Sequence, residues 1–177
     1  KSINLRIETI IDSSSFGNSI KRGIKVVLCG KPNAGKSSLF NRLSGSNRAI
    51  VTNIAGTTRD TIEAWLEISG IPVCIIDTAG LNKTKDKIER LGVAKSNKEI
   101  SNSDILLVLD EENPKKFYEQ NNFSKYKNDT ILIHTKSDLN ISSVNHENTI
   151  IISVKNDTGI KTLYTELSTL IKKNLSY

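Results

Sequence analysis

The sequence predicts a three-layer α/β sandwich, with helices on both faces of a mostly parallel six-stranded sheet that has one antiparallel edge strand. From Gly23 onward, short runs of β-branched residues alternate with longer segments that have helical periodicity. The runs are almost uniformly apolar, as parallel strands buried on both faces are. Only Ser69 and Gly70 separate the runs at 61–68 and 71–77. Two residues are too few for a crossover helix, so these two strands must form an antiparallel hairpin at the sheet edge.

The elements expected from these patterns follow in chain order. Strands are expected at 24–29, 61–68, 71–77, 105–110, 130–135 and 149–153, and helices at 36–43, 86–101, 114–120 and 158–172. The last helix has Ile160, Leu163 and Leu167 on one face, and Thr158 is its expected N-cap. The stretch 111–129 is rich in Asn, Lys and Glu, so we expect a solvated excursion from the sheet.

Length and composition are those of one globular domain with a short appended segment. The chain has 177 residues, of which 37% are hydrophobic and 25% are charged, a balance that can fill a single core. Residues 1–22 have the pattern of an amphipathic helix and a linker, so we expect them to be the stub of a neighbouring helical domain and 23–177 to form the domain proper. The chain begins at Lys1 and contains no Met, so we expect it to be a domain cut from a longer protein.

Charge and cysteine usage exclude several classes of function. The net charge is +6, but the basic residues are scattered, so a solvated surface is favoured over a nucleic-acid-binding face. Cys29 and Cys74 lie inside apolar strand runs and are expected to be buried and reduced. No cysteine or histidine spacing fits a metal site, no stretch approaches the roughly 20 apolar residues of a membrane span, and no signal-peptide pattern opens the chain. We therefore expect a soluble domain from a reducing compartment.

A phosphate-binding loop is predicted at 30–37. The segment Gly-Lys-Pro-Asn-Ala-Gly-Lys-Ser fits the Gly-x-x-x-x-Gly-Lys-Ser/Thr pattern, and it follows a predicted strand and opens a predicted helix, as that pattern requires. Gly30 and Gly35 allow the backbone to wrap with its N–H groups pointing inward, and Lys36 places a positive charge at the β and γ phosphates. The Ser37 hydroxyl is the expected Mg²⁺ ligand. The alternative is a glycine-rich turn with no ligand.

Three further polar segments follow predicted strands. The segment 77–80, Asp-Thr-Ala-Gly, ends a strand, so Asp77 emerges at the carboxyl end of the sheet, where a carboxylate that meets Mg²⁺ through its bound water belongs. Gly80 can present its N–H to a γ-phosphate and move when that group departs. The segments Thr-Lys-Ser-Asp at 135–138 and Ser-Val-Lys at 153–155 follow the last two strands.

With these motifs in this order, the sequence resembles the Ras-like superfamily of GTP-binding proteins, which have a P-loop NTPase fold. The base-specificity motif of that family is Asn-Lys-x-Asp, and this chain has Thr135 at its first position, a variant that some members share. The resemblance implies that Asp138 accepts hydrogen bonds from guanine, that Lys136 lies along the base plane and that the Val154 N–H reads the guanine carbonyl. The nucleotide-binding residues that it implies are Asn33, Ala34, Gly35, Lys36, Ser37, Ser38, Thr57, Thr58, Asp77, Gly80, Thr135, Lys136, Asp138, Ser153, Val154 and Lys155.

The segment 49–60 is the predicted loop that orders around Mg²⁺ and the γ-phosphate. Its tandem hydroxyls make Thr58 the expected Mg²⁺ ligand from this loop, with Thr57 as the alternative. The run Gly-Thr-Thr-Arg-Asp in this loop resembles the subgroup that includes the Era, EngA and MnmE (TrmE) GTPases. Ras-type enzymes place a Gln directly after Asp-Thr-Ala-Gly to orient the attacking water. Leu81 stands there in this chain, and a hydrocarbon cannot hold a water.

Two further residues resemble parts of the MnmE machinery. The run Asp-Lys-Ile-Glu-Arg-Leu-Gly resembles the MnmE segment whose glutamate orients the attacking water. This resemblance implies that Glu89 is a catalytic residue, in addition to Lys36. From its spacing alone, Glu89 equally fits a solvated helix position. Asn33 resembles the MnmE asparagine that ligates K⁺ together with main-chain oxygens of the loop that here carries Thr52 and Ile54. The cation would supply the positive charge of an Arg finger. The alternative for Asn33 is a turn-forming role.

The resemblance as a whole implies a Ras-like, potassium-stimulated GTPase domain over 23–177 that binds GTP and GDP with Mg²⁺ and K⁺. In the MnmE family, such a domain drives conformational change in tRNA wobble-uridine modification, with a homodimer of GTPase domains in the transition state. The resemblance also implies a cytoplasmic protein, with no membrane contact, whose full-length form meets tRNA and a MnmG (GidA)-type partner. Two alternatives remain open: a ribosome-assembly GTPase of the Era or EngA kind, and a guanine-nucleotide switch with low turnover.

Overall fold

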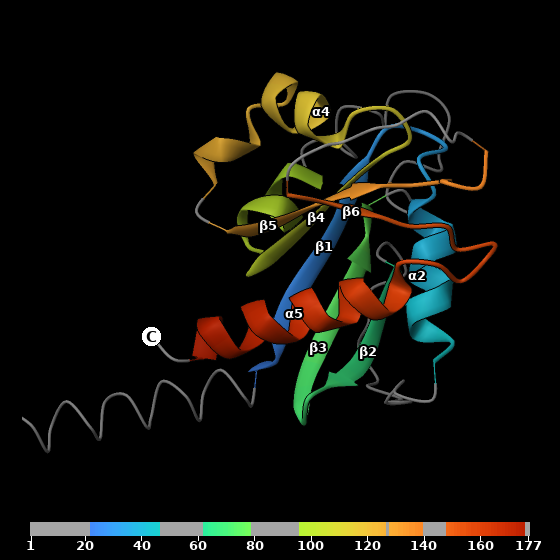
Figure 1. The fold of residues 1–177 in the computed structure, drawn as a ribbon. Helices are drawn as coiled ribbons and strands as arrows, with labels where there is room; N and C mark the ends of the chain where they lie inside the picture. Colours follow the sequence, from blue (N-terminus) through green and yellow to red (C-terminus); the bar gives the residue numbers. More distant parts are fainter. Residues whose placement is uncertain (1–21, 47–61, 79–95, 127, 140–147, 176–177) are drawn as a thin grey trace, which may run out of the picture.

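The computed structural model describes residues 22–46, 62–78, 96–126, 128–139 and 148–175, and Figure 1 shows their fold. The strands are β1 (Ile24–Gly30), β2 (Ile62–Ile68), β3 (Ile71–Asp77), β4 (Ile105–Asp110), β5 (Asp129–His134) and β6 (Thr149–Ile151). They form one six-stranded sheet in the order β2-β3-β1-β4-β5-β6. Of the pairs in this sheet, β2 with β3 is antiparallel and the others are parallel. The predicted sheet with one antiparallel edge strand is confirmed.

Helices cover both faces of the sheet. The described helices are α2 (Lys36–Ser44), α4 (Pro114–Gln120), the short 3-10 helix η2 (Phe123–Lys125) and α5 (Ile160–Leu175), and residues 96–101 are also helical. Side chains of α2 and α5 pack in one apolar cluster, and those of α4, η2 and 96–101 pack in another. Along β1, Val26 and Leu28 join the first cluster while Val27 joins the second, because neighbouring strand residues face opposite sides. The sheet is therefore the middle of three layers (Figure 1).

Both cysteines lie in the second of these clusters, as expected. Cys29 and Cys74 are free thiols that are 4% and 7% exposed. Burial raises the pKa of each thiol to about 12, because a thiolate would lose its hydration there. Both thiols therefore stay protonated and act as small apolar core residues.

The start of α5 differs from the prediction. Thr158 is not the N-cap, because its N–H and carbonyl pair with those of Ser153 in an isolated antiparallel bridge. The carbonyl of Gly159 instead accepts the first helical hydrogen bond, from the Leu163 N–H at 3.0 Å. Gly159 has a left-handed φ of 73°, and a Cβ there would lie 2.0 Å from the Ile151 carbonyl oxygen. The bridge, a contact that helical periodicity does not reveal, thus moves the cap by one residue.

The stretch after β4 is mostly exposed, as its composition predicts, but a buried aromatic ring anchors it to the core. The ring of Phe123 is buried and packs edge-to-face against Phe117 and Tyr118, with 6.0 Å between the ring centroids of each pair. Phe117 and Tyr118 come from α4, where the side chain of the N-cap Asn113 accepts the Lys116 N–H. Three aromatic rings therefore fix how this largely exposed stretch packs against the sheet.

The carboxyl ends of the parallel strands meet at one edge of the sheet. In the strand register, Gly30 of β1 lies beside Leu109 of β4, and Asp110 lies beside His134 of β5. Asp77 ends β3 at the same edge. Ligands of doubly wound sheets bind at this edge, and the connection from β1 to α2 begins there.

The opposite end of β1 is entered through Gly23, whose φ of 73° is left-handed. A Cβ at this position would lie 2.7 Å from Cζ3 of Trp65 and 3.0 Å from the Pro72 carbonyl oxygen. The β2–β3 hairpin therefore packs directly on the backbone where the predicted domain begins. The expected helix and linker at 1–22 lie almost wholly outside the described residues.

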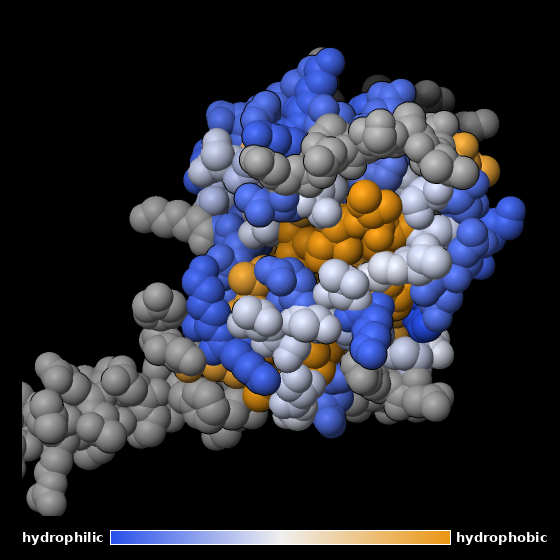
Figure 2. All heavy atoms as spheres, viewed as in Figure 1, coloured by the Kyte–Doolittle hydropathy of each residue, from blue (hydrophilic) through white to orange (hydrophobic). Residues whose placement is uncertain are grey.

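Figure 2 shows the face of the molecule that carries α5. Polar residues form most of its outline, and an apolar patch lies above α5, where Figure 1 places β6. β6 is an edge strand, and its Ile151 is 48% exposed. In the part of the chain that the structure describes, no helix has both the length and the hydropathy needed to cross a bilayer.

Candidate functional site

The backbone between β1 and α2 has a conformation that only certain residue types can adopt. Asn33 and Gly35 have left-handed φ values of 63° and 85°. Backbones that turn in this way can direct successive N–H groups toward one anion. Gly30 has no room for a side chain, because a Cβ would lie 2.2 Å from the Leu109 carbonyl oxygen of the neighbouring strand. The glycines of the predicted phosphate loop therefore stand where the local geometry requires them.

Lys36 is held inside this loop. It is 7% exposed, and its ammonium donates to the carbonyls of Gly30 at 2.8 Å and of Lys31 at 2.6 Å. Burial lowers the pKa of Lys36, and the charge of Asp77 partly offsets that effect. Because its hydrogen bonds go to neutral carbonyls, the ammonium brings a positive charge to the loop that only the nearby Asp77 carboxylate partly balances.

A pocket of about 480 Å³ opens over the loop. Its lining combines the phosphate loop with the connection that follows β5. Among these described lining residues two are lysines and none is acidic, so the pocket favours an anionic ligand. The lining residues are Pro32, Asn33, Gly35, Lys36, Ser37, Ser38 and Lys136.

Ser37 and Asp77 meet beside this pocket. The Ser37 hydroxyl donates to the Asp77 carboxylate at 2.8 Å. Asp77 is 1% exposed, and the hydroxyl of the next residue, Thr78, donates to the Leu28 carbonyl at 2.8 Å, which fixes the end of β3. A hydroxyl and a carboxylate are the oxygen donors that Mg²⁺ prefers. These two residues therefore fit the Mg²⁺ site that the sequence predicts.

The connection after β5 is tied to the phosphate loop. The Thr135 hydroxyl is buried and donates to the Ala34 carbonyl at 3.0 Å. The Thr135 N–H donates to the Asp110 carbonyl at 3.0 Å, and the Ser137 N–H donates to the Ile152 carbonyl at 3.2 Å. The threonine that stands at the first position of the base-specificity motif thus contacts the phosphate loop directly.

Asp138 pairs with Ser153 across two loops. The Ser153 hydroxyl donates to Oδ1 of Asp138 at 2.7 Å and accepts the Asn156 N–H at 3.2 Å. This hydrogen bond from Ser153 lowers the pKa of Asp138, and the charges of Lys155 and Lys136 act in the same direction. Asp138 is therefore ionised at neutral pH, and one of its oxygens has a fixed partner.

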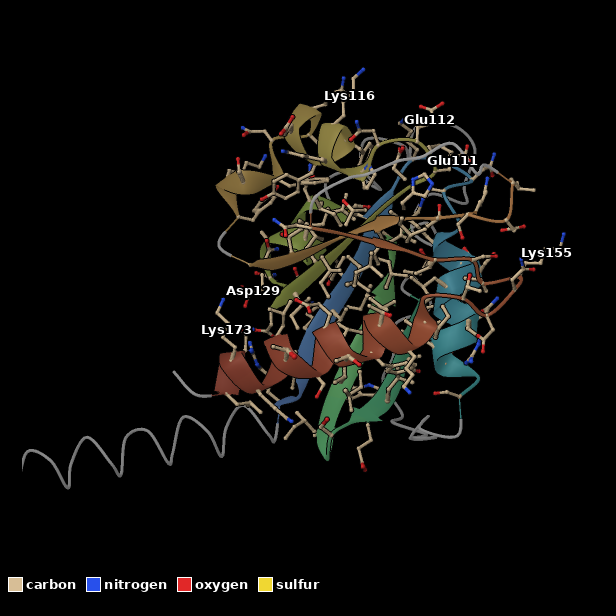
Figure 3. The ribbon with its side chains drawn as sticks, in the orientation of Figure 1. Glu111, Glu112, Lys116, Asp129, Lys155 and Lys173 are labelled. Atoms are coloured by element: carbon tan, nitrogen blue, oxygen red, sulfur yellow. The ribbon has the colours of Figure 1, made fainter. Side chains whose placement is uncertain are left out.

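The loop after β6 is anchored to α2. Val154 and Lys155 follow Ser153 in this loop, and Lys155 is exposed and points away from the molecule in Figure 3. Arg42 of α2 makes a bidentate pair with Asp157, with distances of 2.6 and 3.0 Å. Asp157 has a left-handed φ of 55°, so this pair holds a tight turn of the loop against the helix that follows the phosphate loop.

The structure gathers the described part of the predicted site at one edge of the sheet. These residues are Asn33, Ala34, Gly35, Lys36, Ser37, Ser38, Asp77, Thr135, Lys136, Asp138, Ser153, Val154 and Lys155. The other predicted site residues, Thr52, Ile54, Thr57, Thr58, Gly80 and Glu89, lie outside the described residues, as does Leu81.

Sequence reasoning missed the acidic residues that face the two loops. Nζ of Lys31 lies 3.0 Å from Oδ2 of Asp110, and Nζ of Lys136 lies 2.5 Å from Oε2 of Glu111. The run Asp-Glu-Glu at 110–112 was the available signal, because it follows a strand that ends at the edge where the phosphate loop begins.

Comparison with known proteins points in the same direction as the geometry. Residues 25–139 match the family described as 50S ribosome-binding GTPase. The tRNA modification GTPase MnmE of Vesicomyosocius okutanii is 42% identical over 96% of the chain, and that of Aquifex aeolicus is 39% identical over 96%. MnmE of Dechloromonas aromatica is 50% identical over 60% of the chain. The chain spans 39% of the length of the first two relatives and 24% of the third.

Solved structures share the fold at low identity. A crystal structure of an Aquifex aeolicus Era variant bound to GDP and aluminium fluoride has a TM-score of 0.62 and 22% identity, and the match covers 84% of this chain and 56% of that one. The G domain of the T. maritima FeoB iron transporter has a TM-score of 0.58 and 22% identity, with 85% and 98% covered. These likenesses support the fold alone.

Proposed function

Because this chain belongs to the 50S ribosome-binding GTPase family, whose members hydrolyse GTP, we propose that its GTPase cycle serves tRNA modification, as in the MnmE proteins that it resembles. We assign this activity to a GTP-binding domain over 23–177 of a longer protein. The observation that carries the site assignment is the hydrogen bond from Thr135 to Ala34, at 3.0 Å. It joins the loop that carries Asp138 to the loop that carries Lys36, so a base and its phosphates have fixed binding groups at both ends.

Each end of a guanine nucleotide has a chemical partner in this arrangement. The Lys36 ammonium and the N–H groups of the loop bind the β and γ phosphates. The Asp138 carboxylate accepts from the ring N–H and the exocyclic amine of guanine, neither of which adenine offers. Lys136 lies along the base, and the Val154 N–H donates to the guanine carbonyl.

Mg²⁺ is part of the proposal because the oxygen donors present suit it. Ser37 and Asp77 hold the ion, with Thr58 or Thr57 as the ligand from the preceding loop. When bound, Mg²⁺ neutralises the charge that develops on the phosphates during transfer to water.

Hydrolysis needs a group that orients water, because Leu81 replaces the Gln of Ras-type enzymes. We assign this role to Glu89, on its resemblance to the MnmE glutamate. Glu89→Ala is expected to abolish GTP turnover in single-turnover assays while GTP affinity stays unchanged. A loss of affinity would assign Glu89 a structural role.

We propose that K⁺ supplies positive charge in place of an Arg finger, with Asn33 and the main-chain oxygens of Thr52 and Ile54 as ligands. GTP hydrolysis by the chain should be strongly faster in potassium chloride than in sodium chloride. Equal rates in the two salts would refute this mechanism. Asn33→Gly separates cation binding from turn formation, because glycine adopts a φ near 63° without strain and carries no amide. If Asn33 only forms the turn, this variant keeps the potassium effect.

The assembly proposed for this chain follows the same resemblance. Two GTPase domains would associate in the transition state, and the full-length protein would meet tRNA and a MnmG-type partner in the cytoplasm. Light scattering of the chain with GDP and aluminium fluoride tests the first step. We expect a dimer in potassium chloride and a monomer in sodium chloride, and a monomer in both would argue against it.

Two other functions keep specific support. Leu81 favours a guanine-nucleotide switch with low turnover, which would show no hydrolysis in either salt. The run Gly-Thr-Thr-Arg-Asp also fits a ribosome-assembly GTPase of the Era or EngA kind. Relatives named as tRNA modification GTPases, at 39–50% identity, favour the first proposal over both.

A further inference from the structure

The turn that follows β4 contacts both loops of the nucleotide site. Asp110 is the last residue of β4, and Glu111 and Glu112 follow it. Figure 3 shows Glu111 and Glu112 close together at the upper right of the molecule, the end from which the β1–α2 connection also runs in Figure 1. Nothing in the expected nucleotide-binding set accounts for three consecutive acidic residues beside a pocket that suits an anion.

Asp110 is a buried carboxylate whose Oδ1 accepts two hydrogen bonds and whose Oδ2 has an ion-pair partner. Its side chain is 1% exposed, its Oδ1 accepts the N–H groups of Glu112 at 2.8 Å and Asn113 at 2.7 Å, and Lys31 lies 3.0 Å from its Oδ2. Burial pushes the pKa of Asp110 upward, but the two N–H bonds and Lys31 outweigh it and hold that pKa below its ordinary value. Asp110 is therefore a fixed negative charge, and Lys31 is its partner from the phosphate loop.

Lys31 connects this charge to the phosphate-binding lysine. Its ammonium lies 3.0 Å from Oδ2 of Asp110 and 3.6 Å from Oε2 of the exposed Glu112, and its carbonyl accepts the ammonium of Lys36 at 2.6 Å. The Lys31 carbonyl also accepts the Ala34 N–H at 3.2 Å. Holding the Lys31 side chain therefore fixes a carbonyl that in turn positions Lys36 and closes the loop.

Glu111 acts on the other loop. Its carboxylate pairs with the ammonium of Lys136 at 2.5 Å, and Lys136 has a left-handed φ of 56°. The backbone supports the same connection, because the Asp110 carbonyl accepts the Thr135 N–H. Neighbouring residues of one turn thus hold a lysine from each loop.

We propose that the turn 110–112 sets the spacing between the phosphate loop and the base loop, with Asp110 and Glu111 as positioning residues that act through Lys31 and Lys136. This inference rests on the nucleotide site proposed above. The two residues act at different ends of the ligand. Asp110 positions the loop that binds the phosphates, and Glu111 positions the loop that binds the base.

Competition against radiolabelled GDP tests this division, with unlabelled GDP and inorganic pyrophosphate as the two competitors. Asp110→Asn should weaken GDP and pyrophosphate by the same factor, about tenfold, because Lys31 then keeps only its longer, solvent-exposed pair with Glu112. Glu111→Gln should weaken GDP about threefold, as expected for a partly exposed ion pair, and leave pyrophosphate unchanged. Glu119→Gln on the exposed side of α4 is the matched control and should change neither.

The outcomes separate this inference from the proposed function. If the unaltered chain binds no guanine nucleotide, the nucleotide site itself fails. If the chain binds GDP and both variants match Glu119→Gln, or if Glu111→Gln weakens pyrophosphate as much as GDP, the nucleotide site stands and the positioning roles are wrong.

A second pair of variants covers the case in which Asp110→Asn does not fold. The Lys31 side chain is half exposed, so a substitution there should not disturb the core. Lys31→Gln should weaken GDP and pyrophosphate equally, and Lys31→Arg, which keeps the charge and can reach the same carboxylate, should restore both. Equal binding by Lys31→Gln and the unaltered chain would overturn the role of Asp110.

Discussion

The phosphate end of the site depends mainly on backbone geometry, whereas the base end depends mainly on side chains. At the phosphate end the backbone provides the structure, because Gly30 stands where no side chain fits and Lys36 is buried against carbonyls. At the base end, partly exposed side chains provide it, with Asp138 held by Ser153 and Lys136 held by an acidic neighbour. At the phosphate end, a change at Gly30 therefore disturbs local structure, whereas a change at Lys36 removes charge alone. A site end built from side chains can change its ligand while the fold remains.

The largest expected effect comes from Gly30→Ala. The added methyl group would lie 2.2 Å from the Leu109 carbonyl oxygen, so β1 and β4 must move apart. We expect a loss of about 3 kcal/mol in the free energy of unfolding, or about 10 °C in melting temperature. Gly70→Ala is the matched control, because its φ of 81° adds strain but no atom lies within 4 Å of the new methyl group. It should cost only about 1 kcal/mol. Equal losses in thermal melts would show that the approach of β4 is not what requires Gly30.

Lys36→Met tests whether the phosphate end binds every nucleotide alike. Methionine keeps the apolar stem and removes the ammonium, so every nucleoside triphosphate should lose affinity by the same factor, about 100-fold or more. Titrations with GTP, ATP and xanthosine triphosphate measure this. A variant that lost GTP but kept ATP would show that Lys36 recognises the base as well.

Asp138→Asn should instead change which base the site prefers. An amide cannot accept from both the ring N–H and the exocyclic amine of guanine, so GTP affinity should fall at least tenfold while the affinity for xanthosine triphosphate rises. The melting temperature should stay within about 2 °C, because the residue is not part of the core. Unchanged GTP affinity would remove Asp138 from the base site.

The smallest expected effect is that of pH. The pKa of Asp138 lies below its ordinary value of 3.8, chiefly because Ser153 donates to the carboxylate. The charged form is therefore favoured in the folded protein, and it is lost only as the pH falls through this lowered pKa. The contribution of Asp138 to GDP affinity, measured as the ratio of affinities of the unaltered chain and Asp138→Asn, should then stay constant from pH 8 to about 5. In Ser153→Ala the decline should begin at a higher pH, and a decline at the same pH would deny the hydrogen bond that role.

Most of the sheet is predictable from the sequence because its signals are local. The two-residue turn at 69–70 and the apolar runs place the strands within one or two residues. The clearest difference between prediction and structure is the end of β6. The apolar pattern predicts a strand to residue 153, but β6 ends at Ile151. Ser153 is instead paired with Thr158, a contact within the β6–α5 loop that no periodicity encodes.

The candidate site divides in the same way. Gly30 to Ser37 is one contiguous motif whose residue types answer to backbone geometry, so the sequence alone predicts it. The pairs Lys31–Asp110 and Lys136–Glu111 join residues far apart in the chain. Lysines and glutamates are usually solvated, so their identities alone give no reason to expect these contacts.

The approach of Trp65 to Gly23 has a practical consequence. Trp65 is the single tryptophan of the chain, and its ring lies where β1 begins, at the junction with the preceding segment. The emission of an indole changes with the polarity and rigidity of its surroundings. The chain therefore carries an intrinsic fluorophore at this junction, and a change in emission on adding a nucleotide would reveal movement between the sheet and whatever precedes it without any attached dye.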